Sequence, residues 1–509
     1  MVKPILKAYF TSLLGVLSGL LTQLVYIRAL TQIISINEFA LYAFVFQVTV
    51  YMSILQLGLD FATSREIALK LGKNDFDGAN QSFLFIRRFN KKICFGGFAL
   101  VVICAALFYS GVGLNSNFDY PMAAKLVLLF GASMVISFLA NPSIVALIGN
   151  NNQSVVNINN VFVTISTTSV GYILLKTTLL GVYALPICLV AFNSLNFFLL
   201  RSKALKHCNN WLQPDTALSI KKGYNESILR FSVIATIGGF AWTIEATSDV
   251  FILNSGGMLT LVGFYVLWWR FPQMFFDLAT KLTTSSVPSL NTSYSRSPEE
   301  ATLLFNRLLI VVGGIGFIIY SGIASCLTSF IYLWVGPQFL VEDFQQVSFL
   351  IGLLIYSRII GNCLGMFTIS IGRVKYSTTL SWIQAIVKVI VAIFLVQSLG
   401  LKGMFIGSIA GSLIQVIGSA ILLLKQKLVR KDILIIIMLG YISPFVLFLI
   451  NFPARISLFK FLNVSGLILI CSLSSWVIYI KLMSLEVKLN FTLSARYFLI
   501  KLRKPNLDF

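Results

Sequence analysis

About fourteen apolar runs follow one another along this chain of 509 residues, and each is long enough to cross a bilayer. A helix rises about 1.5 Å per residue, so about 20 apolar residues span the hydrocarbon layer. The runs predict an all-α polytopic membrane protein with about fourteen transmembrane helices. The predicted spans are 9–30, 39–60, 93–114, 122–148, 155–176, 179–200, 230–253, 258–288, 305–334, 345–371, 378–398, 402–424, 433–452 and 460–482.

The composition agrees with a surface that mostly does not face water. Only 11% of the residues are charged, whereas a water-soluble domain carries roughly 25%. The first run is too long for the apolar part of a signal peptide, which is about 7–15 residues, so we expect it to be the first membrane helix. The seven cysteines contain no CxxC pair, so neither a disulfide framework nor a metal site is indicated.

The loops alternate in charge along the chain. Basic residues are abundant in one set of loops, as in Arg87, Arg88, Lys91 and Lys92, and scarce in the other set. The positive-inside rule places the basic set in the cytoplasm, and an even number of helices then puts both termini there. The net charge of +21 is therefore mainly topological, and no nucleic-acid partner is expected.

A weak internal repeat suggests how the helices are grouped. The stretches Leu20 to Asp60 and Trp242 to Thr283 share one plan, in which a helix ends, a short outer turn follows and an aromatic-rich helix begins. Two lobes of six helices would leave such an echo. The expected divisions are 1–206 for the N-lobe, 207–228 for a cytoplasmic interlobe loop, 229–424 for the C-lobe, 425–484 for two further helices and 485–509 for a cytoplasmic amphipathic tail.

One cytoplasmic stretch is predicted in more detail. Residues 61–92 should extend the second helix, break at Gly72, restart near Asp75 or Asp77 and lead into the third span.

Motifs of enzymes and nucleotide-driven pumps are absent from the sequence. It contains no HExxH, Walker or Gly-rich phosphate motif and no nucleophile–base pattern. The outer loops are short, which disfavours a membrane-embedded glycan polymerase or ligase. We expect no enzyme activity, no cofactor and no metal.

Ionisable residues inside the apolar runs are the candidate functional residues. A charge at the bilayer centre costs about 2.5–3.5 kcal/mol on insertion scales, so such residues usually face an internal cavity. Glu245 and Asp249 share one helix face at a spacing of four residues. The other candidates lie in the eighth, tenth and eleventh spans and are Arg270, Asp277, Lys281, Arg358 and Lys388.

Two interpretations of these charges are open. Glu245 and Arg270 fall at similar depth beside the turn 254–258, so they could form a structural salt bridge between packed helices. The four cations, however, outnumber the three acids, which favours a cationic cavity in the second half of the chain. Arginine and lysine suit a diphosphate group. Glu245 or Asp249 would then be candidates for proton coupling, with Asp277 as a further pairing residue.

Three stretches carry a family resemblance. They are SLLGVLSGLLTQLVYIRAL (12–30), NEFALYAFVFQVTVYMSILQLGLDFATSREIA (37–68) and SDVFILNSGGMLTLVGFYVLWWRFPQMFFDLATKLTTSSVPSL (248–290). With the hydropathy of nearly the whole chain, they resemble Wzx-type oligosaccharide flippases of the multidrug/oligosaccharidyl-lipid/polysaccharide (MOP) exporter superfamily.

The resemblance implies a MATE-like fold with two lobes, a central cavity and alternating access. It implies transfer of an undecaprenyl-diphosphate-linked oligosaccharide across the bacterial inner membrane for O-antigen or capsule assembly. It also implies partners, namely the lipid-linked glycan, the phospholipid bilayer, and the polysaccharide polymerase and chain-length proteins. The alternatives within the superfamily are a lipid II flippase and a drug or cation antiporter, although the cationic bias speaks against the antiporter.

Overall fold

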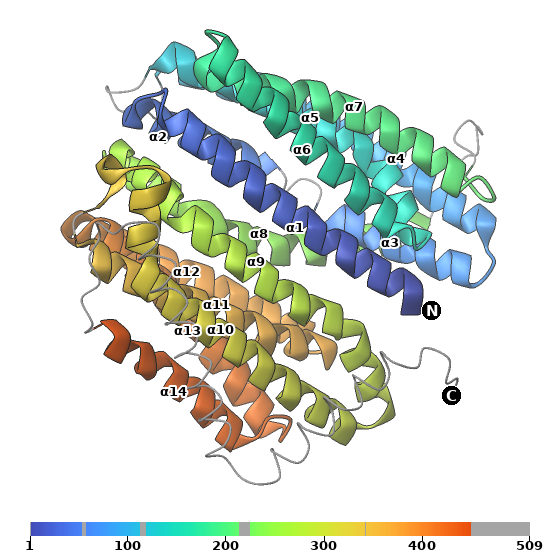
Figure 1. The fold of residues 1–509 in the computed structure, drawn as a ribbon. Helices are drawn as coiled ribbons and strands as arrows, with labels where there is room; N and C mark the ends of the chain where they lie inside the picture. Colours follow the sequence, from blue (N-terminus) through green and yellow to red (C-terminus); the bar gives the residue numbers. More distant parts are fainter. Residues whose placement is uncertain (1, 53–56, 112–118, 213–223, 342, 449–509) are drawn as a thin grey trace. The chain divides into compact units, whose positions relative to one another are not determined.

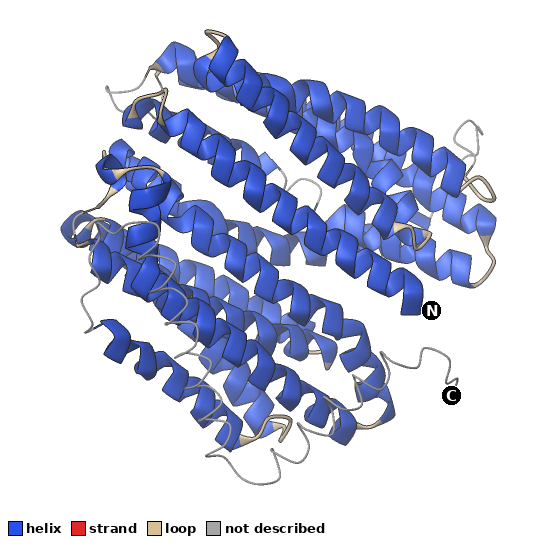
Figure 2. Cartoon of the chain, viewed as in Figure 1, coloured by secondary structure: helices blue, strands red, loops and turns tan. Residues whose placement is uncertain are grey.

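The computed structural model describes the chain except for residues 1, 53–56, 112–118, 213–223, 342 and 449–509. The described residues form fourteen α-helices and two short 3-10 helices, and none of them forms a strand (Figure 2). Nine of the described helices are long and apolar enough to cross a membrane. The prediction of an all-α, multi-pass membrane protein is confirmed.

Contacts divide the chain into two compact units, of which the first comprises Met1–Leu267 and Ala392–Leu401. Its helices are α1 (Val2–Thr31), α2 (Ile36–Val50), α3 (Leu57–Gly72), α4 (Phe76–Tyr109), α5 (Tyr120–Gly149), α6 (Gln153–Thr177), η2 (Gly181–Tyr183), α7 (Ala184–His207), α8 (Tyr224–Ser255) and the start of α9 (Leu259–Arg296) (Figure 1).

The second unit comprises Trp268–Val391 and Lys402–Phe509. It contains most of α9, then α10 (Pro298–Trp334), η3 (Pro337–Phe339), α11 (Phe344–Ser370), most of α12 (Val374–Leu399) and α13 (Leu401–Lys425), and α14 (Lys431–Phe448). The contact division falls inside α9. The lobe boundaries expected from the repeat, at 206 and 229, stay a prediction.

Several helices begin where a side chain caps the first turn. Ser35 and Glu38 form a reciprocal capping box before α2, in which the Ser35 N–H donates to Glu38 Oε2 at 2.8 Å. Asp75 accepts from the N–H of Gly78 at 2.9 Å at the start of α4. These side chains satisfy backbone donors that have no partner inside the helix, so they fix where the chain turns into a helix.

The predicted break in the cytoplasmic stretch is confirmed, because α3 ends at Gly72 and α4 starts after its Asp75 cap. The second predicted span was wrong as one continuous helix. The helix α2 stops at Val50, since the N–H of Tyr51 turns to the carbonyls of Val48 and Thr49 and tightens the last turn, and α3 begins at Leu57. The predicted span 460–482 and the amphipathic tail lie outside the described residues.

In the first unit, α5 packs against α2, α3, α4 and α7, while α6 packs against α1 and α7. A polar contact crosses this apolar packing, because the side-chain amide of Asn141 on α5 donates to the Asp60 carboxylate on α3 at 2.9 Å. The contact gives Asp60 a partner inside the unit.

In the second unit, glycines bring helices together. A Cβ at Gly352 on α11 would lie 2.6 Å from the Tyr320 ring on α10, and one at Gly411 on α13 would lie 2.8 Å from the Gln384 carbonyl oxygen on α12. Small residues at helix contacts are the usual means of close packing in membranes.

Contacts within each unit bring together loops that the charge pattern assigns to the same side. The Lys402 ammonium lies 2.7 Å from the Asp343 carboxylate, which joins the α12–α13 turn to the α10–α11 loop. Thr260, after α8, donates to the Asn37 side chain, before α2, at 3.1 Å. Both pairs join loops that the sequence predicts to be outer, while the side of the membrane on which they lie stays a prediction.

Candidate functional site

Three charged residues follow one face of α9 in the second unit. Arg270, Asp277 and Lys281 are spaced by seven and four residues, which is close to two turns and one turn of a helix. All three side chains are half-buried. The face predicted from the sequence is therefore present as one row on one helix.

Asp277 lies at the centre of this group. Its carboxylate interacts electrostatically with Lys281, Arg270 and Arg358, and its Oδ1 accepts a hydrogen bond from Gln273 Nε2 at 3.0 Å. No direct ion pair joins it to any residue that the structure describes. We call Arg270, Asp277, Lys281 and Arg358 the charged cluster.

Arg358 reaches the charged cluster from α11. It is only 9% exposed, and its guanidinium carbon lies 4.7 Å from the ring centroid of Trp269 on α9. On α13, the Phe405 ring lies 6.4 Å from that of Trp269, centroid to centroid. Arg358 thus lies over Trp269, whose ring in turn packs near Phe405, and a cation over a tryptophan face gains electrostatic attraction.

The neighbouring residue fixes the direction of α9 at this point. Trp268 is fully buried, and its indole N–H donates to the carbonyl of Phe339 in η3 at 3.0 Å. Because consecutive residues of a helix point about 100° apart, burying Trp268 orients Trp269 toward Arg358 and Phe405.

Lys388 is placed differently from the other predicted cations. Its side chain has no exposed surface, and it lies on α12 where α13 passes closely, with its Cβ 2.9 Å from a Cβ built at Gly411. It is not among the charges that act on Asp277. The structure therefore places Arg270, Lys281 and Arg358 within electrostatic range of Asp277, and Lys388 at the contact of α12 with α13.

The remaining two acids lie in the first unit, on α8. Glu245 is 6% exposed and Asp249 is fully buried. The Tyr265 hydroxyl donates to the Asp249 carboxylate. Tyr51 bonds to the Thr247 side chain and lies within electrostatic range of Asp249. Since Arg270 belongs to the second unit, its pairing with Glu245 stays a prediction.

Three neighbours of these charges were missed in the sequence. Gln273 precedes Asp277 by one helical turn, a spacing that does predict contact, and Trp269 stands directly before Arg270. Both lie within an otherwise apolar run of the sequence. Tyr265 had no local signal, because its contact with Asp249 depends on the turn between α8 and α9.

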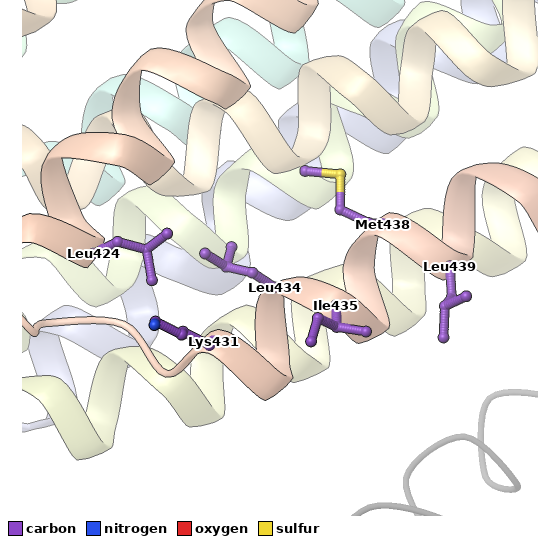
Figure 3. A pocket seen from close by; sticks show the side chains of 6 residues that line it. All are labelled: Leu424, Lys431, Leu434, Ile435, Met438 and Leu439. Carbon is purple, nitrogen blue, oxygen red and sulfur yellow. The ribbon is translucent and has the colours of Figure 1, made fainter.

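A separate groove lies along α13 and α14 (Figure 3), with a volume of about 390 Å³. It shares no residue with the charged cluster. Its lining is apolar except for one cation, and consists of Leu424, Lys431, Leu434, Ile435, Met438 and Leu439.

A metal site finds no support in the described part of the chain, where no three His, Cys, Asp or Glu side chains gather. The charged cluster offers cationic donors, which suit an anionic guest.

No protein-family model and no curated protein sequence matches the chain. Solved structures do match it. A structure described as the lipid II flippase MurJ in an inward closed conformation aligns with a TM-score of 0.66 at 16% identity, over 94% of this chain and 98% of that one. An inward-facing multidrug resistance MATE family transporter of the MOP superfamily aligns with a TM-score of 0.64 at 15% identity, over 82% of this chain and 99% of that one.

A third match is a MOP superfamily transporter from Pyrococcus furiosus, with a TM-score of 0.60 at 16% identity, over 82% of this chain and 95% of that one. Its description states that a reversed polarity of the binding pocket suggests a different function for that protein. The fold of this chain is therefore that of the MOP-superfamily transporters, and the expectation of a MATE-like fold is confirmed.

Proposed function

We propose that this chain is a flippase that moves an undecaprenyl-diphosphate-linked oligosaccharide across the bacterial inner membrane by alternating access. The product would serve O-antigen or capsular polysaccharide assembly. The observation that carries the proposal is the charged cluster, in which three cations on α9 and α11 lie within electrostatic range of one carboxylate. The MOP-superfamily fold supports it.

The chemistry of the cations suits a diphosphate. The guanidinium groups of Arg270 and Arg358 can each hold two phosphate oxygens, while Lys281 supplies a point charge. Lys388 is a further candidate for binding the diphosphate. It would reach the guest in a conformation in which α12 and α13 separate. Neither a cofactor nor catalysis is part of this function.

A lipid II flippase is the second candidate, because the MurJ structure aligns over 94% of this chain and the MATE transporter over 82%. Both candidates handle a lipid-linked diphosphate and differ in the glycan. Expression of this chain in cells depleted of their own lipid II flippase separates them, since only a lipid II flippase restores growth. A drug or cation antiporter would need an acidic cavity, and the charged cluster has the opposite polarity.

The two arginines of the charged cluster provide the test of the proposal. We expect Arg270→Ala or Arg358→Ala to abolish glycan display at the cell surface while the protein remains folded in the membrane, because each change removes a phosphate-binding group. Arg430→Ala is the matched control, since Arg430 is exposed and paired with Asp432 at 2.7 Å. Normal display by both cluster variants would make a cationic transport site wrong.

Coupling to protons is proposed for Glu245 and Asp249, on the basis of two buried acids one turn apart on α8. We expect transport in sealed vesicles to accelerate under an imposed pH gradient, and we expect Asp249→Asn to remove that response. A rate that ignores both pH and sodium gradients would end the coupling hypothesis and leave the flippase proposal standing.

The cellular setting follows from the same proposal. We place the chain in the inner membrane with both termini in the cytoplasm, on the basis of the basic loops. A polysaccharide polymerase and chain-length proteins stay predicted partners, while the phospholipid bilayer is the medium of the apolar helices.

A further inference from the structure

Asp277 has two neighbours one helical turn away, in opposite directions along α9. Gln273 lies four residues before it and Lys281 four residues after it. An acid and a lysine at this spacing commonly form an ion pair on a helix. Here the carboxylate bonds to the Gln273 amide at 3.0 Å instead.

The Lys281 ammonium is left open by this arrangement. Within the residues that the structure describes, no hydrogen bond or direct ion pair involves it, and its side chain is half-buried. Asp277 still acts on it electrostatically. The acid therefore lowers the local positive potential without occupying the ammonium donors.

The charges of the cluster do not cancel. Of its four residues, Arg270, Lys281 and Arg358 are cations and Asp277 is the one acid, so the formal charges of these four residues sum to two positive charges. A diphosphate that joins a lipid to a sugar carries one negative charge on each phosphate. The charge of such a dianion is equal and opposite to the formal charge of these four residues.

We infer that Asp277, held by Gln273, is a fixed counter-charge that limits how tightly the cluster binds a dianionic guest, so that the guest can leave. The inference rests on the proposed function and deepens it. A site that transports must bind well enough to load and weakly enough to release. Asp277 is thus a residue that tunes affinity, and it does not itself contact the phosphates.

Substitution of an ordinary binding residue weakens affinity for the guest, whereas substitution of Asp277 should strengthen it. Removing the Asp277 charge should tighten anion binding, because a repulsive interaction with the guest is lost. The gain in affinity should be about tenfold for a guest with two negative charges and about threefold for a guest with one. Flipping should slow, because release becomes harder.

The experiment titrates the purified full-length protein in lipid nanodiscs with two probes. One is a short-chain polyprenyl diphosphate sugar, and the other is the corresponding monophosphate sugar. We expect Asp277→Asn to bind both more tightly, with the larger gain for the diphosphate, and to flip the diphosphate probe more slowly in proteoliposomes. Asp432→Asn, a change at a half-buried acid that is paired with Arg430 and lies outside the charged cluster, is the matched control and should leave both unchanged.

A second variant tests the role of Gln273 without changing the charge of the site. In Gln273→Ala the carboxylate loses its hydrogen bond and is released to pair directly with Lys281. We expect anion binding to weaken severalfold, which is the opposite direction from Asp277→Asn. A variant that merely damages packing would not move the two affinities in opposite directions.

The outcomes separate this inference from the proposed function. If Asp277→Asn leaves the affinity unchanged or weakens it while Arg270→Ala abolishes binding, the counter-charge role is wrong and the flippase proposal stands. If the wild-type protein binds neither probe, the proposed function itself fails.

Discussion

The guanidinium of Arg358 lies on the face of Trp269, and this contact restricts a side chain that has many rotamers. A free arginine loses about 2 kcal/mol of rotamer entropy when it is fixed in one geometry. Because the contact with Trp269 restricts the Arg358 side chain before a guest binds, less rotamer entropy is lost on binding. The contact is therefore expected to matter for affinity and not only for packing.

Substitution of Trp269 tests this expectation. We expect Trp269→Leu to weaken binding of a polyprenyl diphosphate sugar by about two- to thirtyfold, which corresponds to the usual strength of a cation–π contact. Trp269→Phe retains an aromatic face and should lose less. Titration of the purified variants measures both.

The control for Trp269 is Trp242→Leu, because Trp242 on α8 is 57% exposed. Equal losses of affinity in Trp269→Leu and Trp242→Leu would show that the loss of any tryptophan harms the protein. That result would contradict the claim that Trp269 holds Arg358 in place for binding.

At this scale the sequence predicted the charged residues and not their partners. The cost of burying charge was enough to single out Arg270, Asp277, Lys281 and Arg358. Trp269 and Gln273 are ordinary in an apolar helix, so nothing in composition distinguishes them. Their roles depend on how α9 is rotated, which is set by burial of Trp268 and its hydrogen bond to Phe339.

At the scale of elements, the contact of α12 with α13 depends on Gly411. A methyl group there would come within 2.8 Å of the Gln384 carbonyl oxygen and 2.9 Å of the Lys388 Cβ. A backbone oxygen cannot rotate away, so the two helices would have to separate. The same contact holds the fully buried Lys388 in place.

The variant Gly411→Ala should therefore lower stability by about 1–3 kcal/mol, which is the usual cost of overpacking. The midpoint of heat-induced unfolding in detergent would fall. Gly322→Ala is the control, because a Cβ at Gly322 on α10 meets no atom within 4 Å. If both variants unfold at the wild-type temperature, the close approach of α12 and α13 is not as described.

Helix ends were predictable where a capping residue or glycine marked them. Gly72 and Asp75 gave the break between α3 and α4. The interruption after Val50 was not predictable, because the segment is uniformly apolar and hydropathy carries no information on a tightened turn. Tyr51 there bonds to the Thr247 side chain on α8, a tertiary contact that the local sequence pattern does not reveal.

At the scale of the whole molecule, the buried acids and the charged cluster belong to different units. The acids Glu245 and Asp249 lie on α8 in the first unit, and the charged cluster lies in the second. The chain passes from one unit to the other within α9, between Leu267 and Trp268. The helix α9 thus carries both Tyr265, which bonds to Asp249, and three of the four residues of the charged cluster.

The succession of apolar runs was enough to predict the fold class, because length and hydropathy dictate membrane helices directly. The glycan was not predictable. Sugars are bound by few and variable polar contacts, and neither the residue pattern nor a fold shared at 15–16% identity specifies them.

The most direct test of the account is lipid analysis of cells that lack this chain. We predict that a polyprenyl-diphosphate-linked repeat unit accumulates and that an impermeant glycosidase added to intact spheroplasts does not degrade it. Re-expression of the wild-type chain should clear the accumulated lipid, while the double variant Arg270→Ala, Arg358→Ala should not. Absence of any diphosphate-linked glycan, or clearance by the double variant at the wild-type rate, would contradict a cationic flippase.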